Sequence, residues 1–421
     1  MGPTSLFFFP SQPVKSLVAF FVIWKGFLLA VAAAASLVPD YDTSTSLFFD
    51  GNYGVGAQVP ALAKMLTRWD ALYFMQSLRR GYVFEQEWAF GAALPMLART
   101  VIAVMPRGIA PALEPVVVIS LVHLSHLTAV LALHRLTMVV YDDAKLALVA
   151  SALHVVSPAG LFLSAPYAES PFAALSFIGF LVFAMGQRTS RRRAGRALAV
   201  VGAGLVLGLA TAFRSNGLAS GLLFAVETMD CLIKFARRPS LNTLLFLASS
   251  VFGGVLVASG SVIPQAVAWK RYCRDSKGPR PWCQRTVPSI YTFVQGEYWN
   301  VGFLRYWTVN QLPLFFLASP MLFILISSGL AMYRNPSTGQ YHRRLVRSLA
   351  AVQTLVAVLA ITNYHVQVIS RLSSGFPVWY WWVAGRILDG RTRSRTRAVV
   401  LFMVLYAGIQ GGLFACFLPP A

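Results

Sequence analysis

Three acidic side chains fall close together near the start of the chain, in a protein with only 15 Asp and Glu residues. They are Asp70, Glu85 and Glu87, in the stretch 67–97, which reads TRWDALYFMQSLRRGYVFEQEWAFGAALPML. Asp70 stands between an Arg-Trp pair and Ala-Leu-Tyr-Phe, and aromatic surroundings of this kind can adapt a carboxylate to acid–base catalysis. The alternative is an amphipathic segment whose acids balance neighbouring basic residues, namely Arg68, Arg79 and Arg80. Spacing alone leaves both interpretations open.

Two further charged residues lie at the ends of apolar stretches. Glu169 closes the sequence SPAGLFLSAPYAES (157–170), and a carboxylate at such depth is costly unless it is paired. The same residue could instead favour a helix N-terminus before Pro171 through the helix dipole. Arg214, in ATAFRSNGL with Asn216, could be snorkelling to the membrane surface, but a shaped polar pocket with a phosphate ligand is an equally good interpretation.

Two later segments combine aromatic residues with amides and arginines. The loop 269–312 is rich in Lys and Arg, and its second half interleaves aromatics with polar residues: Gln295, Tyr298, Trp299, Arg305, Asn310 and Gln311. The segment 363–382 repeats the pattern with His365, Gln367 and Arg371 beside an aromatic cluster. Aromatic faces with amide and Arg donors are how proteins hold sugars and phosphates, but they also anchor re-entrant helices at a membrane interface.

The elements that must position these residues are membrane helices. Hydrophobic residues make up 57% of the chain and charged residues only 12%, and apolar runs long enough to cross a bilayer recur from end to end. The sequence therefore predicts an all-α polytopic membrane protein, folded as a single membrane domain over residues 1–421, with about eleven transmembrane helices. The predicted spans are 14–38, 115–140, 147–163, 171–186, 197–213, 217–233, 241–268, 313–333, 346–361, 377–387 and 398–417.

Charge predicts the orientation of these spans. Basic residues cluster in the connections 188–196, 234–238, 334–347 and 386–397, which all lie on one side if the spans alternate, and the positive-inside rule makes that side cytosolic. The net charge of +21 therefore does not indicate a nucleic-acid partner. The loops 39–114, with an interfacial helix at 62–78, and 269–312 are then the two large lumenal elements, and an anionic substrate would explain the basic residues left there.

The cysteines and the common catalytic motifs add little chemistry. Cys273 and Cys283 share one lumenal loop, where a disulfide is plausible although two free thiols remain an alternative. The sequence contains no HExxH, CxxC, GxxxxGK[ST] or GxSxG motif, and we expect no metal or other cofactor. Asp40-Tyr41-Asp42 is the only DxD-like spacing and directly follows the first span, so a lipid-linked sugar donor is favoured over a sugar nucleotide.

Taken together, the residues resemble a lipid-linked-sugar glycosyltransferase of the GT-C type, and specifically the GPI mannosyltransferase 2 family. The motifs that carry the resemblance are RWDALYF with GYVFEQEWAFGAALP (68–95), SPAGLFLSAPYAESPFAALSF (157–177), ATAFRSNGL (210–218), PSIYTFVQGEYWNVGFLRYWTVNQLPLF (288–315) and HVQVISRLSSGFPVWYW (365–381). Their order along most of the chain makes the match stronger than any single motif. The chain departs from the expected pattern at Gly91-Ala92-Ala93, where an aromatic residue is expected after Ala-Phe.

The resemblance implies a multi-pass enzyme of the endoplasmic reticulum membrane with its active site facing the lumen. Its expected reaction is transfer of the second mannose, in α1,6 linkage, from dolichyl phosphate mannose to a GPI-anchor precursor, with inversion. Asp70, in the first lumenal loop, is the expected catalytic base, and Glu85 is the second candidate. Arg214, Arg305 and Arg371 are candidates to hold the leaving phosphate without a metal.

The remaining polar residues of the motifs are expected to bind substrate. They are Arg68, Trp69, Glu169, Asn216, Gln295, Tyr298, Trp299, Asn310, Gln311, His365 and Gln367. The expected partners are the two lipid substrates and the membrane lipids, and the need for a small accessory membrane subunit is left open.

Two other functions are considered. A sister transferase that uses the same donor with another acceptor is the nearer one. A lipid or solute transporter is more distant, because its polar residues would lie near the bilayer midplane in two repeated halves, and no such repeat is present in the sequence. A purely structural subunit is disfavoured by the isolated lumenal acids.

Overall fold

A computed structural model of the chain describes residues 12–105, 111–188, 193–274, 278, 280–390 and 393–419. These residues form α-helices joined by short helical turns, and no β-strand occurs among them. Eight of the helices are long and apolar enough to cross a membrane. They are α1 (Pro13–Ala35), α6 (Glu114–Tyr141), α8 (Glu169–Arg188), α9 (Arg193–Phe213), α11 (Leu241–Trp269), α13 (Leu312–Arg334), α14 (Arg343–Thr362) and α17 (Arg393–Ala415). The predicted all-α polytopic fold is thereby confirmed.

Three predicted spans coincide with shorter helices. These are α7 (Ala144–Val155), α10 (Gly221–Arg237) and α16 (Pro377–Asp389), so the total of eleven spans stays a prediction. The prediction of one helix over 147–163 was wrong, because α7 ends at Val155 and a turn over Gly160–Leu163 follows. Pro158 disfavours helical backbone in the residue before it, and Gly160 adopts a φ of 50°, so the helix cannot continue.

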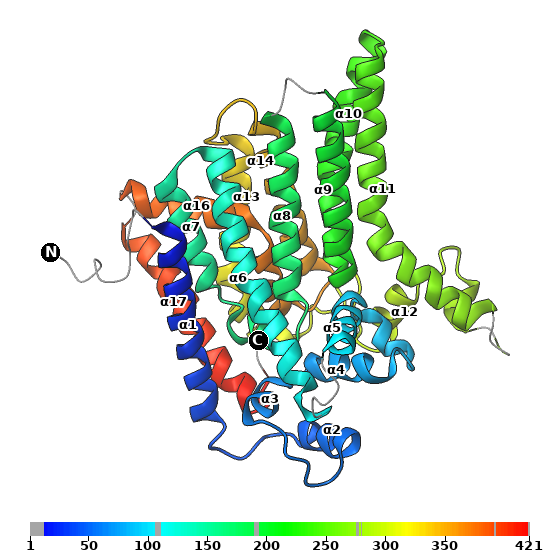
Figure 1. Cartoon of the computed structure of the whole chain (residues 1–421), viewed down its shortest axis with the longest axis vertical. Coiled ribbons are helices and arrows are strands. Elements are labelled where there is room, and N and C mark those ends of the chain that lie inside the picture. The colour runs from blue at the N-terminus through cyan, green and yellow to red at the C-terminus, as the bar shows by residue number, and fades with distance from the viewer. Residues whose placement is uncertain are drawn as a thin grey trace.

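The helix ends sort into two groups in space (Figure 1). The connections α8–α9, α10–α11 and α13–α14, which carry basic clusters, lie at the upper end of the bundle. The short helices α2 (Ser44–Tyr53), α3 (Ala61–Leu66), α4 (Asp70–Arg80), α5 (Ala93–Val104) and α12 (Ile290–Glu297) gather at the lower end. This separation agrees with the predicted orientation. Residues 189–192 and 391–392 of the basic connections lie outside the described residues.

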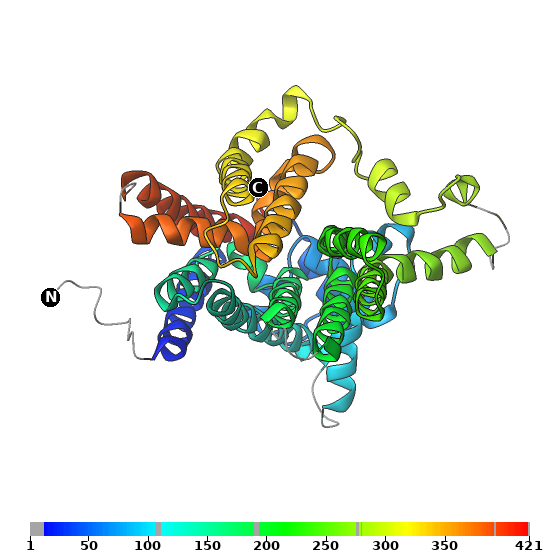
Figure 2. The same cartoon turned by 90° about the horizontal axis from the view of Figure 1, so that it is seen from above.

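Glycines allow close packing of the helices that lead to the polar end. A Cβ at Gly204 would approach Gly253 backbone atoms at 2.5–2.9 Å, and one at Gly208 would overlap the carbonyl oxygen of Leu256. Small residues at such contacts are typical of helix pairs in membranes, because they let two backbones approach. The α9–α11 pair is therefore closely packed, and α9 delivers Arg214 at its lower end (Figure 2 shows the helices end on).

The non-helical segment 156–168 is buried within the bundle. The buried Lys25 of α1 holds it by donating from Nζ to the carbonyl oxygen of Leu163 (2.9 Å) and to Oγ of Ser164 (2.7 Å). Ser170 Oγ donates to the same Leu163 carbonyl (3.1 Å). Buried backbone polar groups need such partners, and these fix the segment that presents Tyr167 and Glu169.

Candidate active site

Asp70 begins α4 directly after a strained turn. The residue before it, Trp69, has φ 55° and ψ −127°, a conformation that is costly for a residue with a side chain and is retained where surrounding contacts enforce it. The hydroxyl of the fully buried Tyr167 supplies two of those contacts, because it accepts from the Asp70 N–H (3.0 Å) and donates to the Arg68 carbonyl (3.1 Å). The turn is thus clamped on both sides of Trp69.

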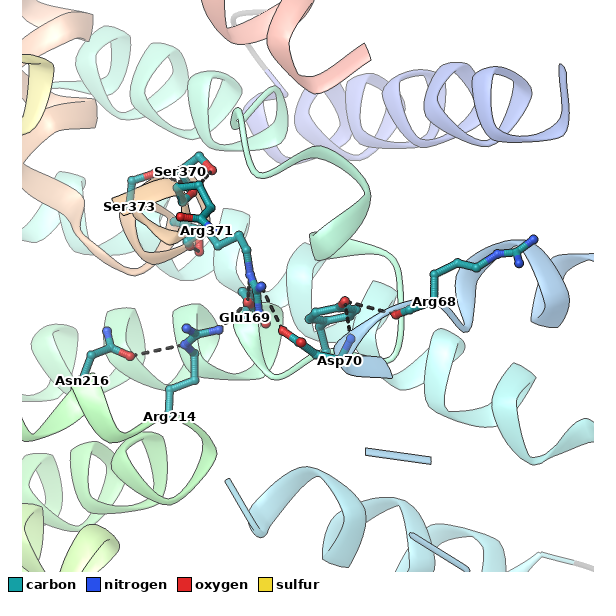
Figure 3. Close-up of polar contacts among 11 residues, drawn as sticks. Arg68, Asp70, Glu169, Arg214, Asn216, Ser370, Arg371 and Ser373 are labelled. Atoms are coloured by element: carbon teal, nitrogen blue, oxygen red, sulfur yellow. Dashed lines mark hydrogen bonds and ion pairs between the residues drawn. The ribbon is translucent and has the colours of Figure 1, made fainter. Parts of the chain in front are cut away.

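The side chains of Arg68 and Trp69 stabilise this turn from the other side. Arg68 donates two hydrogen bonds of 2.8 Å to the carboxylate of Asp40, and the Trp69 ring packs on Phe417 with centroids 4.9 Å apart. Figure 3 shows the side chains of Arg68 and Asp70 extending in opposite directions. The predicted substrate-binding residues Arg68 and Trp69 therefore lie behind the turn.

Asp70 belongs to a chain of alternating charges that joins four distant parts of the sequence (Figure 3). Arg371 Nη1 donates to Asp70 Oδ2 (3.0 Å), and Arg371 Nε donates to Glu169 Oε1 (2.7 Å). Arg214 pairs with the same Glu169 oxygen through Nη1 and with Asn216 Oδ1 through Nε (3.3 Å). Glu169 is fully buried, whereas the Asp70 side chain is 34% exposed, so Glu169 supports two arginines and Asp70 faces outward.

The electrostatics of this chain favour its ionised form. Burial lowers the pKa of Arg371, but the carboxylates of Glu169 and Asp70 outweigh burial and raise that pKa above its ordinary value. Burial and the nearby Asp70 charge raise the pKa of the Tyr167 hydroxyl well above its usual range. Tyr167 is therefore a neutral hydrogen-bonding group, and Arg371 is a permanent cation.

A cavity of about 270 Å³ opens beside the charge chain. Seven residues predicted from the sequence as site residues line it: Asp70, Arg214, Asn216, Gln295, Trp299, His365 and Arg371. They come from the first lumenal loop, the end of α9, α12 and its C-terminal flank, and the segment after α14. The structure therefore brings together one carboxylate, two guanidinium groups, two amides, an imidazole and an indole.

Several of the sequence-predicted residues lie outside the cavity lining. Gln367 accepts from the Tyr306 hydroxyl (3.1 Å), and Tyr298 packs on Phe293. Arg305 and Asn310 are exposed and Gln311 is partly buried, on the stretch that leads from α12 to α13. Glu169 lies behind the lining, where it holds the two arginines.

The other two acids of the stretch 67–97, Glu85 and Glu87, have structural partners. Glu85 Oε1 accepts from Trp282 Nε1 (3.0 Å). Glu87 is buried and accepts from Arg80 as well as from the backbone N–H groups of Val83 (2.6 Å) and Phe84 (3.0 Å). Asp70 is the one of these three acids that lines the cavity.

Sequence reasoning missed the aromatic part of the lining. Tyr73 and Phe90 stack with centroids 4.6 Å apart, and Tyr291 and Tyr364 complete the wall with other apolar residues. Tyr73 lies three residues after Asp70, on the same helical face, and this spacing is a signal that could have identified it. Tyr167 had no such signal, because its role depends on a contact across 97 positions of the chain.

Gly91 is the point where the first lumenal loop touches the end of α9. A Cβ at this position would overlap the carbonyl oxygen of Phe213, the residue before Arg214. The aromatic residue expected near this position from the family pattern has no room at 91. Close backbone contact here fixes the loop that carries Asp70 relative to Arg214.

The second lumenal loop is held by a disulfide and its own small core. Cys273 and Cys283 are bonded, which confirms the predicted alternative of a disulfide. Trp282 is fully buried in a cluster with Trp88, Tyr272, Ile290 and others. Among the described residues, no group of three or more His, Cys, Asp or Glu side chains is arranged to hold a metal ion.

Comparison with known proteins gives consistent matches over the whole chain. The family model described as Mannosyltransferase (PIG-V) matches residues 14–421. A protein named GPI mannosyltransferase 2 from Gibberella zeae is 54% identical over 98% of this chain and 99% of its own length. Proteins of the same name from Chaetomium globosum and Aspergillus oryzae are 48% and 37% identical, each over 98% of this chain and 97% of their own length.

Solved structures resemble the chain more distantly. The oligosaccharyltransferase of Archaeoglobus fulgidus, tethered to an acceptor peptide, aligns with a TM-score of 0.45 and 13% identity. The alignment covers 94% of this chain and 56% of that protein. The same archaeal enzyme in complex with an inhibitory peptide and a dolichol-phosphate gives a TM-score of 0.44 and 12% identity, over 92% of this chain and 56% of that one.

Proposed function

The chain belongs to the mannosyltransferase (PIG-V) family, and we propose that it transfers the second mannose, in α1,6 linkage, from dolichyl phosphate mannose to the one-mannose GPI precursor. The family match and the GPI mannosyltransferase 2 relatives establish it as a mannosyltransferase of GPI-anchor synthesis. The proposal adds the donor, the linkage and the residues. It also places this multi-pass protein in the endoplasmic reticulum membrane with the cavity facing the lumen.

Asp70 is the general base of this reaction. Among the described residues, Arg371 contacts the carboxylate through Oδ2, and the Asp70 side chain is 34% exposed and lines the cavity. Asp70 takes the proton of the acceptor 6-hydroxyl as that oxygen attacks the anomeric carbon of the donor. The carbon–oxygen bond to phosphate breaks with its electron pair, dolichyl phosphate leaves, and the anomeric configuration inverts.

Arg214 and Arg371 stabilise the leaving phosphate. Within the part of the chain that the structure describes, each guanidinium makes its hydrogen bonds and ion pairs through Nε and Nη1, so Nη2 is the nitrogen that we assign to the ligand. Both arginines line the cavity, and Glu169 fixes their positions. Guanidinium donors that are held in place before the reaction lower the energy of developing negative charge without reorganisation.

The aromatic and amide residues of the lining form the sugar-binding wall. Tyr73, Phe90 and Trp299 provide ring faces, and Gln295 and Asn216 provide amide groups. His365 is held by a 2.8 Å hydrogen bond between Nε2 and the Trp299 carbonyl and stacks on Tyr306. The observation that carries the proposal is the position of Asp70 at the cavity, paired directly with Arg371 and connected to Arg214 through Arg371 and Glu169.

Microsomes from cells that lack the endogenous enzyme provide the test. We would supply this chain, radiolabelled dolichyl phosphate mannose and the one-mannose GPI precursor, with and without a chelator. A two-mannose lipid should form in both conditions. Asp70→Asn should reduce its formation by about 10²–10⁴-fold, the usual contribution of a general base, while the protein stays folded.

Glu85→Gln is the matched control, because this carboxylate lies in the same loop but faces Trp282. It should retain most of the activity. A one-mannose lipid that accumulates unchanged would reject the acceptor assignment and favour a sister transferase or a transporter. Full activity of Asp70→Asn would remove Asp70 from the mechanism.

A further inference from the structure

The lumenal end of α11 carries a concentration of positive charge that the reaction above does not use. We call the described residues 269–274, 278 and 280–285 the lumenal hairpin; the Cys273–Cys283 disulfide closes it. Its described basic residues are all exposed: Lys270, Arg271, Arg274, Arg280 and Arg285. Basic residues normally favour the cytosolic side of a membrane protein. The presence of five basic residues at the opposite end of a span therefore needs an explanation.

The hairpin directly follows a candidate membrane span. The apolar helix that precedes it is one of the eight candidate spans, and that span runs without interruption into Arg274. Pro264 lies inside α11, and Figure 1 shows the last part of the helix bending outward from the bundle. Lys270 and Arg274 therefore stand at the end of a candidate membrane span.

The hairpin is fixed against the back of the cavity wall. Tyr272 donates from its hydroxyl to the Val83 carbonyl (3.0 Å), and Arg271 Nη1 donates to the Tyr82 carbonyl (2.5 Å). A few residues further along the same strip of chain, Ala89, Phe90 and Gly91 line the cavity. The basic surface is thus separated from the cavity by one layer of protein.

Within the described residues, little of this charge is paired with a carboxylate. Among the described residues, the ion pair of the hairpin joins Arg280 Nε to Glu85 at 3.7 Å, a distance too long for a strong pair. Arg285 lies over the Phe293 ring at 5.7 Å. An exposed cationic surface at a membrane interface attracts lipid phosphates.

We propose that the lumenal hairpin binds the phosphodiester of the acceptor lipid, with Lys270 and Arg274 as its main contacts. This inference rests on the proposed function, because it requires a phosphatidylinositol-based acceptor. The phosphate of the donor is bonded to the reacting carbon and must lie in the cavity, beside Arg214 and Arg371. The phosphodiester of the acceptor is separated from the accepting mannose by other sugar units, so it must lie outside the cavity, at the headgroup level.

The test compares the full-length protein with the double variant Lys270→Gln/Arg274→Gln in nanodiscs. Two acceptors are used: the one-mannose GPI precursor, and a short-chain glycoside with the same sugars but no phosphodiester. The double variant should raise KM for the natural acceptor by about tenfold, the combined effect of losing two solvent-screened charged contacts. Its kcat, its KM for dolichyl phosphate mannose and its activity on the phosphate-free acceptor should be unchanged.

Lys64→Gln is the control, since Lys64 is also an exposed lysine of the lumenal side. Equal KM values for the double variant and the unchanged protein overturn the inference, as does the same rise with the phosphate-free acceptor or in Lys64→Gln. In all these cases the unchanged protein still forms the two-mannose lipid. If the unchanged protein forms no product, the proposed function itself fails, so the two failures can be distinguished.

Discussion

Two networks of buried charge lie at opposite ends of the helix bundle and are built alike. At the predicted lumenal end, Glu169 pairs with Arg371 and Arg214. At the predicted cytosolic end, Glu227 pairs with Arg196 (2.5 Å) and is 3.7 Å from Arg344, whose guanidinium also binds Asp230 (2.6 Å). Each network has a carboxylate that is at most 4% exposed and two arginines from other helices or loops.

The difference between them lies in what the arginines face. Arg371 extends to a second carboxylate, Asp70, and both arginines of the lumenal network line a cavity. None of the cytosolic network's residues lines that cavity, and Arg344 is 48% exposed, with its charge directed to acids of α10. A buried ion pair alone therefore does not mark a functional site. A functional site is indicated when the ion-paired residues also line a cavity with hydrogen-bond donors and a carboxylate.

The largest contrast should come from removing the central charge of each network. Glu169→Gln leaves two arginines without their shared anion, and breaking a buried pair costs about 3–5 kcal/mol of stability. We expect activity per folded molecule to fall by about a hundredfold, because the phosphate-binding donors lose their positions. Glu227→Gln should destabilise the protein but keep activity per folded molecule near normal.

Melting curves of the purified proteins and transfer rates normalised to folded protein measure both effects. Equal specific activity in Glu169→Gln and Glu227→Gln would show that the two networks are equivalent and purely structural.

A smaller contrast concerns the turn that holds Asp70. Tyr167→Phe removes the hydroxyl that contacts the Asp70 N–H and the Arg68 carbonyl, and it leaves the strained Trp69 backbone without that clamp. We expect kcat to fall about tenfold, with KM for both substrates within twofold, because a misplaced base slows the chemical step. Steady-state kinetics in microsomes measure this split.

Tyr141→Phe is the control, because it removes a hydroxyl from α6, away from the site, that has no hydrogen-bond partner among the described residues. A rise in KM without a change in kcat for Tyr167→Phe would assign Tyr167 to substrate binding instead of to positioning.

The smallest effect should follow from Arg344→Gln. Since this side chain is about half exposed, solvent screening limits its contribution to at most about 1 kcal/mol. Activity should stay within twofold of the unchanged protein, and the melting temperature should fall only slightly. A large loss of activity would mean that the cytosolic network acts on the lumenal site.

The sequence was sufficient to identify the members of the lumenal charge chain. Glu169 and Arg214 were predicted because they stand at the ends of apolar stretches. Asp70 was predicted from a cluster of acids with aromatic neighbours, and Arg371 from a segment that combines aromatic and polar residues. The pairing of Arg371 with residues 202 and 301 positions away could not be read from any local pattern. The resemblance to a known family predicted the overall type of enzyme and the role of Asp70 as the catalytic base.

Other features needed the three-dimensional structure because packing decides them. Glu85 and Asp70 look equivalent in the sequence. In the structure, however, Glu85 accepts a hydrogen bond from Trp282, which lies 197 residues further along the chain. Arg305, Asn310 and Gln311 share a loop with Gln295, but the chain leaves the cavity lining after Val301. The length of α7 was overestimated because hydrophobicity alone does not show that the buried segment 156–168 is non-helical.

The contact at Gly91 has a consequence for how this protein can change over evolutionary time. The loop of the base and the helix end that presents Arg214 meet there backbone to backbone. A residue with a side chain fits at position 91 only if the end of α9 moves away at the same time. Each of these two segments therefore restricts the substitutions that the other can accept. New acceptor specificities should arise more readily from substitutions elsewhere in the cavity lining.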